Sequence, residues 1–305
     1  MHPSSRSKCL VPIALEHLTF HNGEIQLHAV AAGPANGPLV VLLHGFPEFW
    51  YSWHRQIEPL AIAGFRVIVP DQRGYNLSSK PRDVASYTLV HLISDIIAIA
   101  DQAGAQRFHL AGHDWGAAVA WSVAVRHPQR LARLAILNVP HPSVMLRYLR
   151  KNLRQLRRSW YMFLLQLPWL PEKVFSAFHF AFGVRALVRS SRSETFSSED
   201  LELYRQAWAQ PRALTGAMNW YRAGFRYRSP FLDPTVRVPT KIIWGERDAF
   251  LLFEMARASL KYCTDAELIS FPDATHWVHH EEPERVSQLL IDFFGASNSS
   301  PLRDV

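Results

Sequence analysis

Short hydrophobic runs, each the length of a buried strand, alternate along the chain with stretches that have the periodicity of amphipathic helices. The strand-like runs occupy residues 39–43, 67–69, 108–111, 134–137, 241–244 and 268–271. The helix-like stretches between them lie around residues 57–62, 92–100 and 115–125. Since neighbouring parallel strands need a crossover connection, this alternation predicts an α/β fold with a mostly parallel sheet and helices on both faces.

Both ends of this alternation carry further local signals. Asn22-Gly23 separates two alternating segments, which predicts an antiparallel hairpin at the start of the sheet. Thr88 is placed to cap the helix that follows it. Near the other end, apolar residues at helical spacing follow Pro283 and predict a last amphipathic helix: Val286, Leu289, Leu290, Phe293 and Phe294.

The strand rhythm stops between residues 140 and 238. This stretch reads as long helices rich in Arg, Leu and aromatic residues, broken at Pro168, Pro171 and Pro211. We therefore expect an α-helical cap at 140–238, inserted into a core made of residues 1–139 and 239–305. An insertion at this place lies over the carboxyl ends of the strands, where α/β proteins bind ligands.

The segment Gly112-His-Asp-Trp-Gly116 joins a strand-like run directly to a helix-like run. Small residues two before and two after the central position are what a sharp strand-to-helix corner requires. The pattern is that of a nucleophile elbow, G-x-S-x-G, with Asp114 in the serine position. Free N–H groups at the start of the helix favour its ionised form.

A carboxylate at this corner points to a particular chemistry. It is already an anion, and it suits attack on a saturated carbon that bears a strained or good leaving group. The product is an alkyl ester on the enzyme, which a histidine-activated water must then hydrolyse. We therefore expect a histidine, and an acid that orients it, further along the chain.

Both groups follow the last two predicted strands, at the edge of the sheet where Asp114 lies. His276 comes after the run at 268–271, while Asp248 and Glu246 come after the run at 241–244. We favour Asp248 as the partner that orients His276, with Glu246 as the alternative. His276, His279 and His280 also have a spacing that could suit a metal, but no further ligand completes a shell. We expect no metal, and we expect His279 and His280 at the surface.

The loop His44-Gly-Phe-Pro47 follows the first parallel strand. In this place a backbone N–H contributes to an oxyanion hole, and we expect the N–H groups of Phe46 and Trp115 to form it. Pro47 has no N–H. It is either cis, which would aim the Phe46 amide, or a simple turn proline.

Composition and charge add three limits. The chain has 305 residues, of which 48% are hydrophobic and 19% charged, as in ordinary globular proteins. Two cysteines, Cys9 and Cys263, give no disulfide framework or zinc motif. No run approaches the roughly 18 apolar residues of a membrane span, and residues 1–11 lack the apolar core of a secretory signal. We expect a cytoplasmic protein without a transmembrane segment.

The net charge of +7 has a local source. A basic amphipathic helix is predicted over residues 146–158, with leucines at 146, 149, 153 and 156 opposite the basic face. Its basic residues are Arg147, Arg150, Lys151, Arg154, Arg157 and Arg158. The helix presents either a solvated face or a peripheral contact with an anionic membrane or another acidic partner. No nucleic-acid motif is present, so no nucleic-acid partner is expected.

Taken together, the motifs resemble those of the α/β-hydrolase superfamily and, within it, of the epoxide hydrolases. The matching pieces span most of the core: residues 44–48, 71–75, 78–81, 112–116, 138–142, 244–248 and 276–277. The resemblance implies two cap tyrosines that hydrogen-bond the epoxide oxygen, and it assigns them to Tyr161 and Tyr221. A phenol can donate to the oxygen as negative charge develops on it.

The resemblance implies an epoxide as substrate, and the apolar pocket makes a lipophilic one the expectation. No cofactor is called for, and the oligomeric state, monomer or homodimer, stays open. The predicted pocket is largely apolar. Its residues are Phe46, Pro47, Trp50, Trp115, Phe163, Trp220 and Trp277.

Three alternatives stay open. A haloalkane dehalogenase shares the nucleophile and the base, but its halide site usually has Asn where Phe46 stands. A fluoroacetate dehalogenase is less well matched, since Trp115 and Ala118 occupy the stretch where that family has arginines. A non-catalytic receptor of the same fold usually lacks part of the triad, which is intact here.

Overall fold

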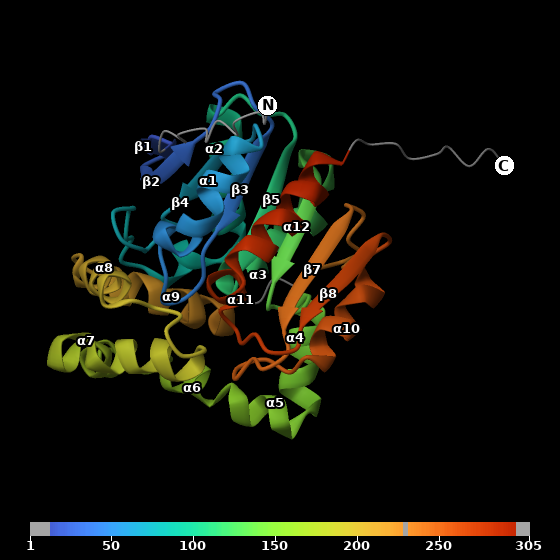
Figure 1. Ribbon diagram of the computed structural model, residues 1–305. Helices are drawn as coiled ribbons and strands as arrows, with labels where there is room; N and C mark the ends of the chain where they lie inside the picture. The colour runs from blue at the N-terminus through green and yellow to red at the C-terminus, as the bar shows by residue number, and fades with distance from the viewer. Residues whose placement is uncertain (1–12, 228–230, 297–305) are drawn as a thin grey trace, which may run out of the picture.

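The computed structural model describes residues 13–227 and 231–296 and contains an eight-stranded sheet covered by helices (Figure 1). The strand order is β1-β2-β4-β3-β5-β6-β7-β8, and pairing is parallel from β4 to β8 and antiparallel at β1–β2 and β2–β4. The strands are β1 (Glu16–Asn22), β2 (Ile25–Ala32), β3 (Leu39–Leu43), β4 (Arg66–Pro70), β5 (Phe108–His113), β6 (Leu131–Leu137), β7 (Thr240–Gly245) and β8 (Ala266–Phe271).

Helices cover both faces of this sheet. The core helices are α1 (His54–Ile62), α2 (Leu89–Gln102), α3 (Trp115–Arg126), α10 (Glu254–Ser259), α11 (Val278–Glu281) and α12 (Pro283–Gly295). Short 3₁₀ turns lie at Trp50–Trp53, Val84–Tyr87, Pro128–Arg130 and Leu260–Tyr262. One hydrophobic cluster packs α2 and α3 against the sheet, and a second packs α1 and α12 against the other face. The predicted mostly parallel sheet with helices on both faces is confirmed.

Local details of the core differ slightly from the prediction. Asn22 pairs with Ile25, so Asn22 is the last strand residue and the hairpin turn is Gly23-Glu24. Thr88 occupies the N-cap position of α2, but its side chain makes no capping hydrogen bond. Pro283 begins α12 as expected. Cys263 is a free thiol, and Cys9 lies outside the described residues.

Between β6 and β7 the described chain is helical. The helices are α4 (Pro142–Lys151), α5 (Leu153–Arg158), α6 (Trp160–Leu164), α7 (Leu170–Ser190), α8 (Ser198–Ala209) and α9 (Ala213–Arg226). They lie below the carboxyl ends of the strands in Figure 1, with α5, α6 and α7 along the lower edge. The inserted α-helical cap predicted from the sequence is therefore present.

The prediction of a single basic helix over residues 146–158 is wrong. The chain forms two helices, because Asn152 leaves the helical conformation and its side chain accepts a hydrogen bond from the Gln155 N–H, which starts α5. The leucine face is not buried either, since Leu153 is 78% exposed. No helix within the described residues is long and apolar enough to cross a bilayer.

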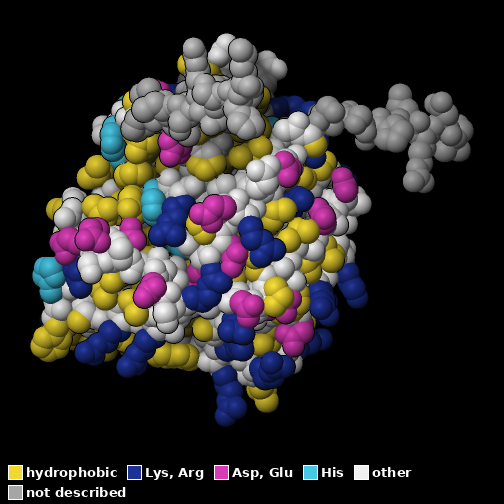
Figure 2. Space-filling view, viewed as in Figure 1, with side chains coloured by type: hydrophobic (Ala, Val, Ile, Leu, Met, Phe, Trp, Pro, Cys, Tyr) yellow, Lys and Arg dark blue, Asp and Glu magenta, His cyan; other side chains and the backbone are white. Residues whose placement is uncertain are grey.

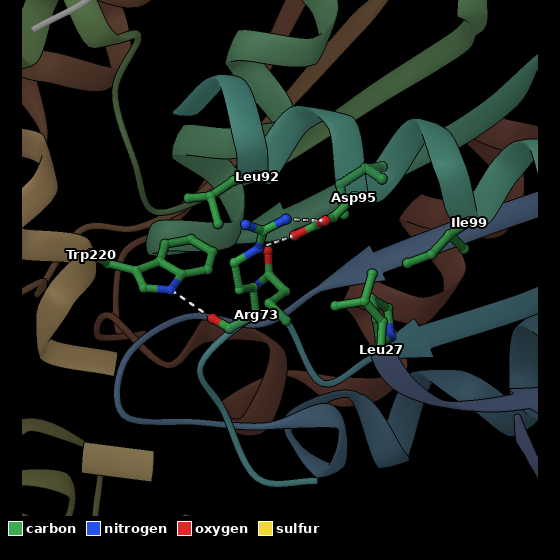
Figure 3. A pocket seen from close by; sticks show the side chains of 9 residues that line it. Leu27, Arg73, Leu92, Asp95, Ile99 and Trp220 are labelled. Atoms are coloured by element: carbon green, nitrogen blue, oxygen red, sulfur yellow. Dashed lines mark hydrogen bonds and ion pairs between the residues drawn. The ribbon is translucent and has the colours of Figure 1, made fainter. Parts of the chain in front are cut away.

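A buried ion pair fastens the loop after β4 to α2. Arg73 donates to both carboxylate oxygens of Asp95, at 2.8 and 2.6 Å, and both side chains are 4% exposed. Figure 3 shows this pair beside a small cavity and Trp220 of α9, whose indole N–H donates to the Arg73 carbonyl at 2.8 Å. The ion pair therefore supports a point where cap and core meet.

Replacement of Asp95 by Asn is expected to lower the free energy of unfolding by about 3–5 kcal/mol, because it leaves the Arg73 guanidinium buried without its anion. Asp101→Asn is the matched control: it breaks an ion pair of the same helix with Arg130, but Asp101 is 59% exposed. The control should cost less than about 1 kcal/mol. Urea unfolding of both variants measures the difference, and equal losses would contradict the account of the buried pair.

Candidate active site

Asp114 lies at the corner between β5 and α3, in a conformation that L-residues rarely adopt, with φ 47° and ψ −122°. The corner is closed by glycines on each side. A Cβ on Gly112 would lie 2.5 Å from the Gly116 carbonyl oxygen, and a Cβ on Gly116 would lie 2.4 Å from that of Leu43. Gly45 also leaves room for the Asp114 side chain, because a Cβ on residue 45 would lie 2.3 Å from the Asp114 Cβ. The sequence pattern thus produces the strained elbow.

The Phe46 N–H donates to Asp114 Oδ1 at 2.8 Å, while Asp114 Oδ2 faces the His276 ring. The Phe46–Pro47 peptide is cis. Burial raises the pKa of Asp114, but hydrogen bonding and the charge of His276, with the Phe46 N–H, outweigh it and hold the pKa below its usual range. The Asp114 carboxylate is therefore ionised, with one oxygen held by an amide and the other directed at the histidine.

His276 lies between two carboxylates. Its Nε2 is 3.6 Å from Asp114 Oδ2, and its Nδ1 is 2.7 Å from Asp248 Oδ2. Glu246 is not the partner of His276, because it accepts a hydrogen bond from Ser270 instead. Asp248 is itself held in place, since its Oδ1 accepts from the N–H groups of Phe250 and Leu251 at 2.7 and 2.9 Å.

Burial lowers the pKa of His276, but the Asp248 charge and the hydrogen bonds to Asp114 and Asp248 together raise it to about 10. The imidazolium is therefore the stable form of the ring while both carboxylates are ionised. Loss of either negative charge must lower the pKa of His276 again.

This pKa has a consequence for stability. A folded-state pKa raised from 6.5 to about 10 stabilises the protein fully below pH 6.5, and that contribution is lost as pH rises toward 10. We expect the free energy of unfolding to fall more between pH 6.5 and pH 10 in the natural sequence than in a His276→Gln variant. Urea unfolding at the two pH values tests this. An equal decrease in both proteins would show that the ring is not held as an imidazolium.

Beneath His276 lies a buried cluster built on Glu48. Glu48 Oε2 is 2.9 Å from His113 Nδ1, Oε1 is 2.8 Å from His280 Nε2, and Tyr204 donates to Oε1 at 3.0 Å. Burial raises the pKa of Glu48, but the hydrogen bonds from His113 and His280 bring it well below its usual range. The expectation that His279 and His280 lie at the surface is wrong: both are buried, because α11 packs against α1 and the sheet.

Glu48, His113 and His279 could in principle hold a metal ion, since their ligand atoms lie within 4.8 Å of one another. However, both ring nitrogens of His113 already have partners, Glu48 and the His276 carbonyl oxygen, each at 2.9 Å. A metal ion would have to break those hydrogen bonds. The cluster supports the backbone of His276.

The two predicted tyrosines lie side by side, close enough to Asp114 for its charge to act on both phenols. The Tyr161 and Tyr221 rings are 6.0 Å apart, Tyr221 lies 5.0 Å from the Trp115 ring, and Tyr161 lies 5.8 Å from Phe250. Burial, together with the nearby Asp114 charge, raises the pKa of both phenols. Both therefore keep their protons and can donate hydrogen bonds.

Known proteins share this chain's fold and much of its sequence. Residues 38–283 match the family model described as "alpha/beta hydrolase fold". The chain is 37% identical to human "Epoxide hydrolase 4", covering 95% of this chain and 80% of the relative. It is 44% identical to the Bacillus subtilis "AB hydrolase superfamily protein YfhM", covering 88% of this chain and 94% of that one. The chain belongs to the epoxide hydrolase family.

Solved structures agree with this assignment. An epoxide hydrolase from Bacillus megaterium in complex with an inhibitor superposes on this family member with a TM-score of 0.83. The sequences are 28% identical over 92% of this chain and 100% of that one. The likeness extends across core and cap together.

Not every predicted pocket residue of this epoxide hydrolase family member faces Asp114. Phe163 is half exposed and packs on Phe225, because it lies on the outer side of α6. Trp220 is buried, its ring contacts that of Trp115 at 5.9 Å, and its indole N–H is directed at the Arg73 carbonyl, as Figure 3 shows. Trp50 has its ring contacts with His17, Phe49 and Tyr51. The contacts of Phe163 and Trp220 do not support their predicted place in the pocket. Trp50 packs against the hydrophobic cluster that contains Tyr221 and Trp277, so its place in the pocket stays a prediction.

The remaining predicted residues lie closer. Phe46 and Trp115 each make an edge-on contact with Tyr221, at 5.3 and 5.0 Å. Pro47 follows Phe46 and accepts a hydrogen bond from Trp208 through its carbonyl oxygen. Trp277 contacts the His276 ring at 5.1 Å and donates to Ser190.

Sequence reasoning missed two supporting residues and one pocket residue. Asn138 donates to Asp248 Oδ2 at 2.8 Å and accepts from the Gly245 N–H. It therefore holds the Asp248 carboxylate in place, although the two residues are 110 positions apart in the sequence. His113 supports the His276 backbone. Phe250 lies between Tyr161 and His276. Both His113 and Asn138 lie within motifs that resemble the epoxide hydrolases, 112–116 and 138–142, but the sequence does not show their hydrogen-bond partners.

Proposed function

We propose that this protein hydrolyses a lipophilic epoxide to a vicinal diol through an ester formed on Asp114. One observation carries the proposal: the Asp114 carboxylate has an amide N–H on one oxygen, a histidine facing the other, and the adjacent phenols of Tyr161 and Tyr221 nearby. The family membership supports an activity on epoxides, and residues 140–238 act as the cap that supplies the phenols. The cytoplasmic location and the oligomeric state stay predictions.

In the first step Asp114 Oδ2 attacks a ring carbon of the epoxide, and the C–O bond of the ring breaks. The electron pair goes to the epoxide oxygen, which accepts hydrogen bonds from Tyr161 and Tyr221 and takes a proton from one of these phenols. The His276 imidazolium supplies the proton that restores this phenol, which leaves the ring neutral for the second step. Donors that strengthen as the charge develops lower the barrier more than donors that only bind substrate. The phenols keep their protons until this moment because their pKa values are raised.

In the second step water attacks Asp114 Cγ, while Oδ1 lies in an oxyanion hole that includes the Phe46 N–H. The neutral His276 ring takes the proton of this water. Esterification prepares the histidine for that role, because it removes the negative charge of Asp114, one of the two groups that raise the pKa of His276. Asp248 remains to orient the ring and to stabilise the cation that forms.

Oxygen labelling distinguishes this path from direct attack by water. With enzyme in excess over an aryl epoxide in ¹⁸O-water, the first turnover should give an unlabelled diol, because its new oxygen comes from Asp114. The label should enter the Asp114 carboxylate and be found in its peptide. A labelled diol from unlabelled enzyme would show direct hydration and refute the ester.

A further inference from the structure

The edge of the cap from residue 146 to 190, called here the cap edge, carries the net charge of the whole protein. It holds nine Lys and Arg residues and one acid, Glu172, which is paired with Arg222. The other residues of the chain balance almost fully, with 24 Lys and Arg against 25 Asp and Glu. Figure 2 shows dark blue basic side chains along the lower rim, where α5, α6 and α7 lie in Figure 1.

The same edge exposes large hydrophobic side chains between its basic residues. Single exposed hydrophobic residues are ordinary, but a dense series along one edge marks an interaction surface. The most informative members come from three consecutive helices and the turn between them: Leu153, Trp160, Trp169, Phe178, Phe182 and Val188. Two of these are tryptophans, which favour the boundary between water and lipid.

One member of the series is held out by strained backbone. Helix α7 is broken at Ala177–Phe180, where Phe178, His179 and Phe180 have φ between 51° and 61°. This left-handed conformation is unfavourable for residues with a side chain. It leaves Phe178 92% exposed. Transfer of this exposed hydrophobic ring from water to an apolar medium lowers its free energy.

We propose that the cap edge docks on an anionic lipid bilayer. Basic residues interleaved with aromatic and aliphatic ones are the pattern of a surface that lies in the membrane interface: the charges attract anionic headgroups and the apolar side chains enter between them. A second copy of the chain fits this edge poorly, because two surfaces of the same strong positive charge would meet.

Helix α6 links this surface to the site. Within five residues it carries the exposed Trp160 and Phe163 and the half-buried Tyr161, whose ring lies 6.0 Å from that of Tyr221. A lipophilic substrate dissolved in the bilayer would therefore meet the cap within one helical turn of the oxygen donor. This supply of substrate rests on the proposed function, whereas docking does not and is tested without substrate.

The experiment measures partitioning of the full chain onto sedimentable vesicles of phosphatidylcholine alone, or with three-tenths phosphatidylglycerol. Binding should require the anionic lipid and weaken in 0.5 M salt, roughly the condition where charges are screened beyond about 4 Å. A triple variant, Arg150→Gln, Lys151→Gln and Arg157→Gln, should bind about 100-fold more weakly, since each basic residue near the surface contributes about fivefold.

The matched control removes the same charge elsewhere, with Arg237→Gln, Lys261→Gln and Arg285→Gln, and should bind like the natural sequence. Trp169→Ser with Phe178→Ser should weaken binding about tenfold at unchanged charge, because it removes inserted side chains. Equal loss of vesicle binding in both triple variants would show that net charge alone causes binding, and it would overturn the proposal of a docking surface. So would absence of binding to anionic vesicles, or self-association in sedimentation that the cap-edge triple variant abolishes.

Discussion

Asp114→Asn should lower kcat for epoxide hydrolysis by at least about 10⁴-fold, the scale seen when a covalent nucleophile is removed. A neutral amide cannot attack the ring carbon as the carboxylate does. The fold should survive, because Asn tolerates positive φ and can still accept from the Phe46 N–H. Diol formation from an aryl epoxide measures the rate, and Asp101→Asn, far out on the surface of α2, serves as control.

Slow recovery of activity in this variant would not contradict the account if the protein mass rises by that of one deamidation. The decisive time point is therefore the freshly prepared protein. Substantial turnover by protein whose intact mass is still that of the Asp114→Asn variant would mean that another group attacks the epoxide.

Tyr161→Phe combined with Tyr221→Phe should lower kcat by about 10³-fold or more, since removal of one donor to a developing oxyanion costs about 10²–10³. Each single variant should keep intermediate activity, because the other phenol still donates. The rings fill the same space, so the edge-on contacts among Tyr161, Tyr221 and Trp115 remain. The loss should therefore lie in chemistry and not in folding.

The double tyrosine variant should slow the first step, formation of the ester. Single-turnover kinetics should show slow formation of the ester, with its hydrolysis less changed, because the phenols act on the epoxide oxygen alone. Tyr51→Phe is the matched control: it removes a phenol that bonds Asp200, outside the site. Full epoxide activity in the double variant would remove the role given to the cap tyrosines.

The parts of the structure that were predictable depend on short stretches of chain. The strand β5, the helix α3 and the elbow between them are encoded by residues 108–126, and the small residues at Gly112 and Gly116 are required within that stretch itself. The order of Asp114, Asp248 and His276 follows from placing each after a strand, because carboxyl ends of parallel strands share one edge.

The parts that failed depend on contacts between distant segments. Burial of His279 and His280 follows from packing of α11 against α1, which no local pattern reports. Asn138 supports the site through its hydrogen bond to Asp248, which lies 110 positions away in the sequence. Residues 146–158 have helical periodicity, yet Asn152 divides them and Leu153 stays exposed, since no partner covers that edge within the described chain.

The central claim is the covalent ester on Asp114, and the intact mass of a His276→Gln variant after exposure to an aryl epoxide tests it most directly. Without the histidine, water is not activated and the reaction should stop at the ester. We expect a mass increase equal to the whole epoxide, located in the peptide that contains Asp114 and absent when Asp114→Asn is added. A folded His276→Gln variant that gains no such adduct, or gains it at another residue, would contradict it.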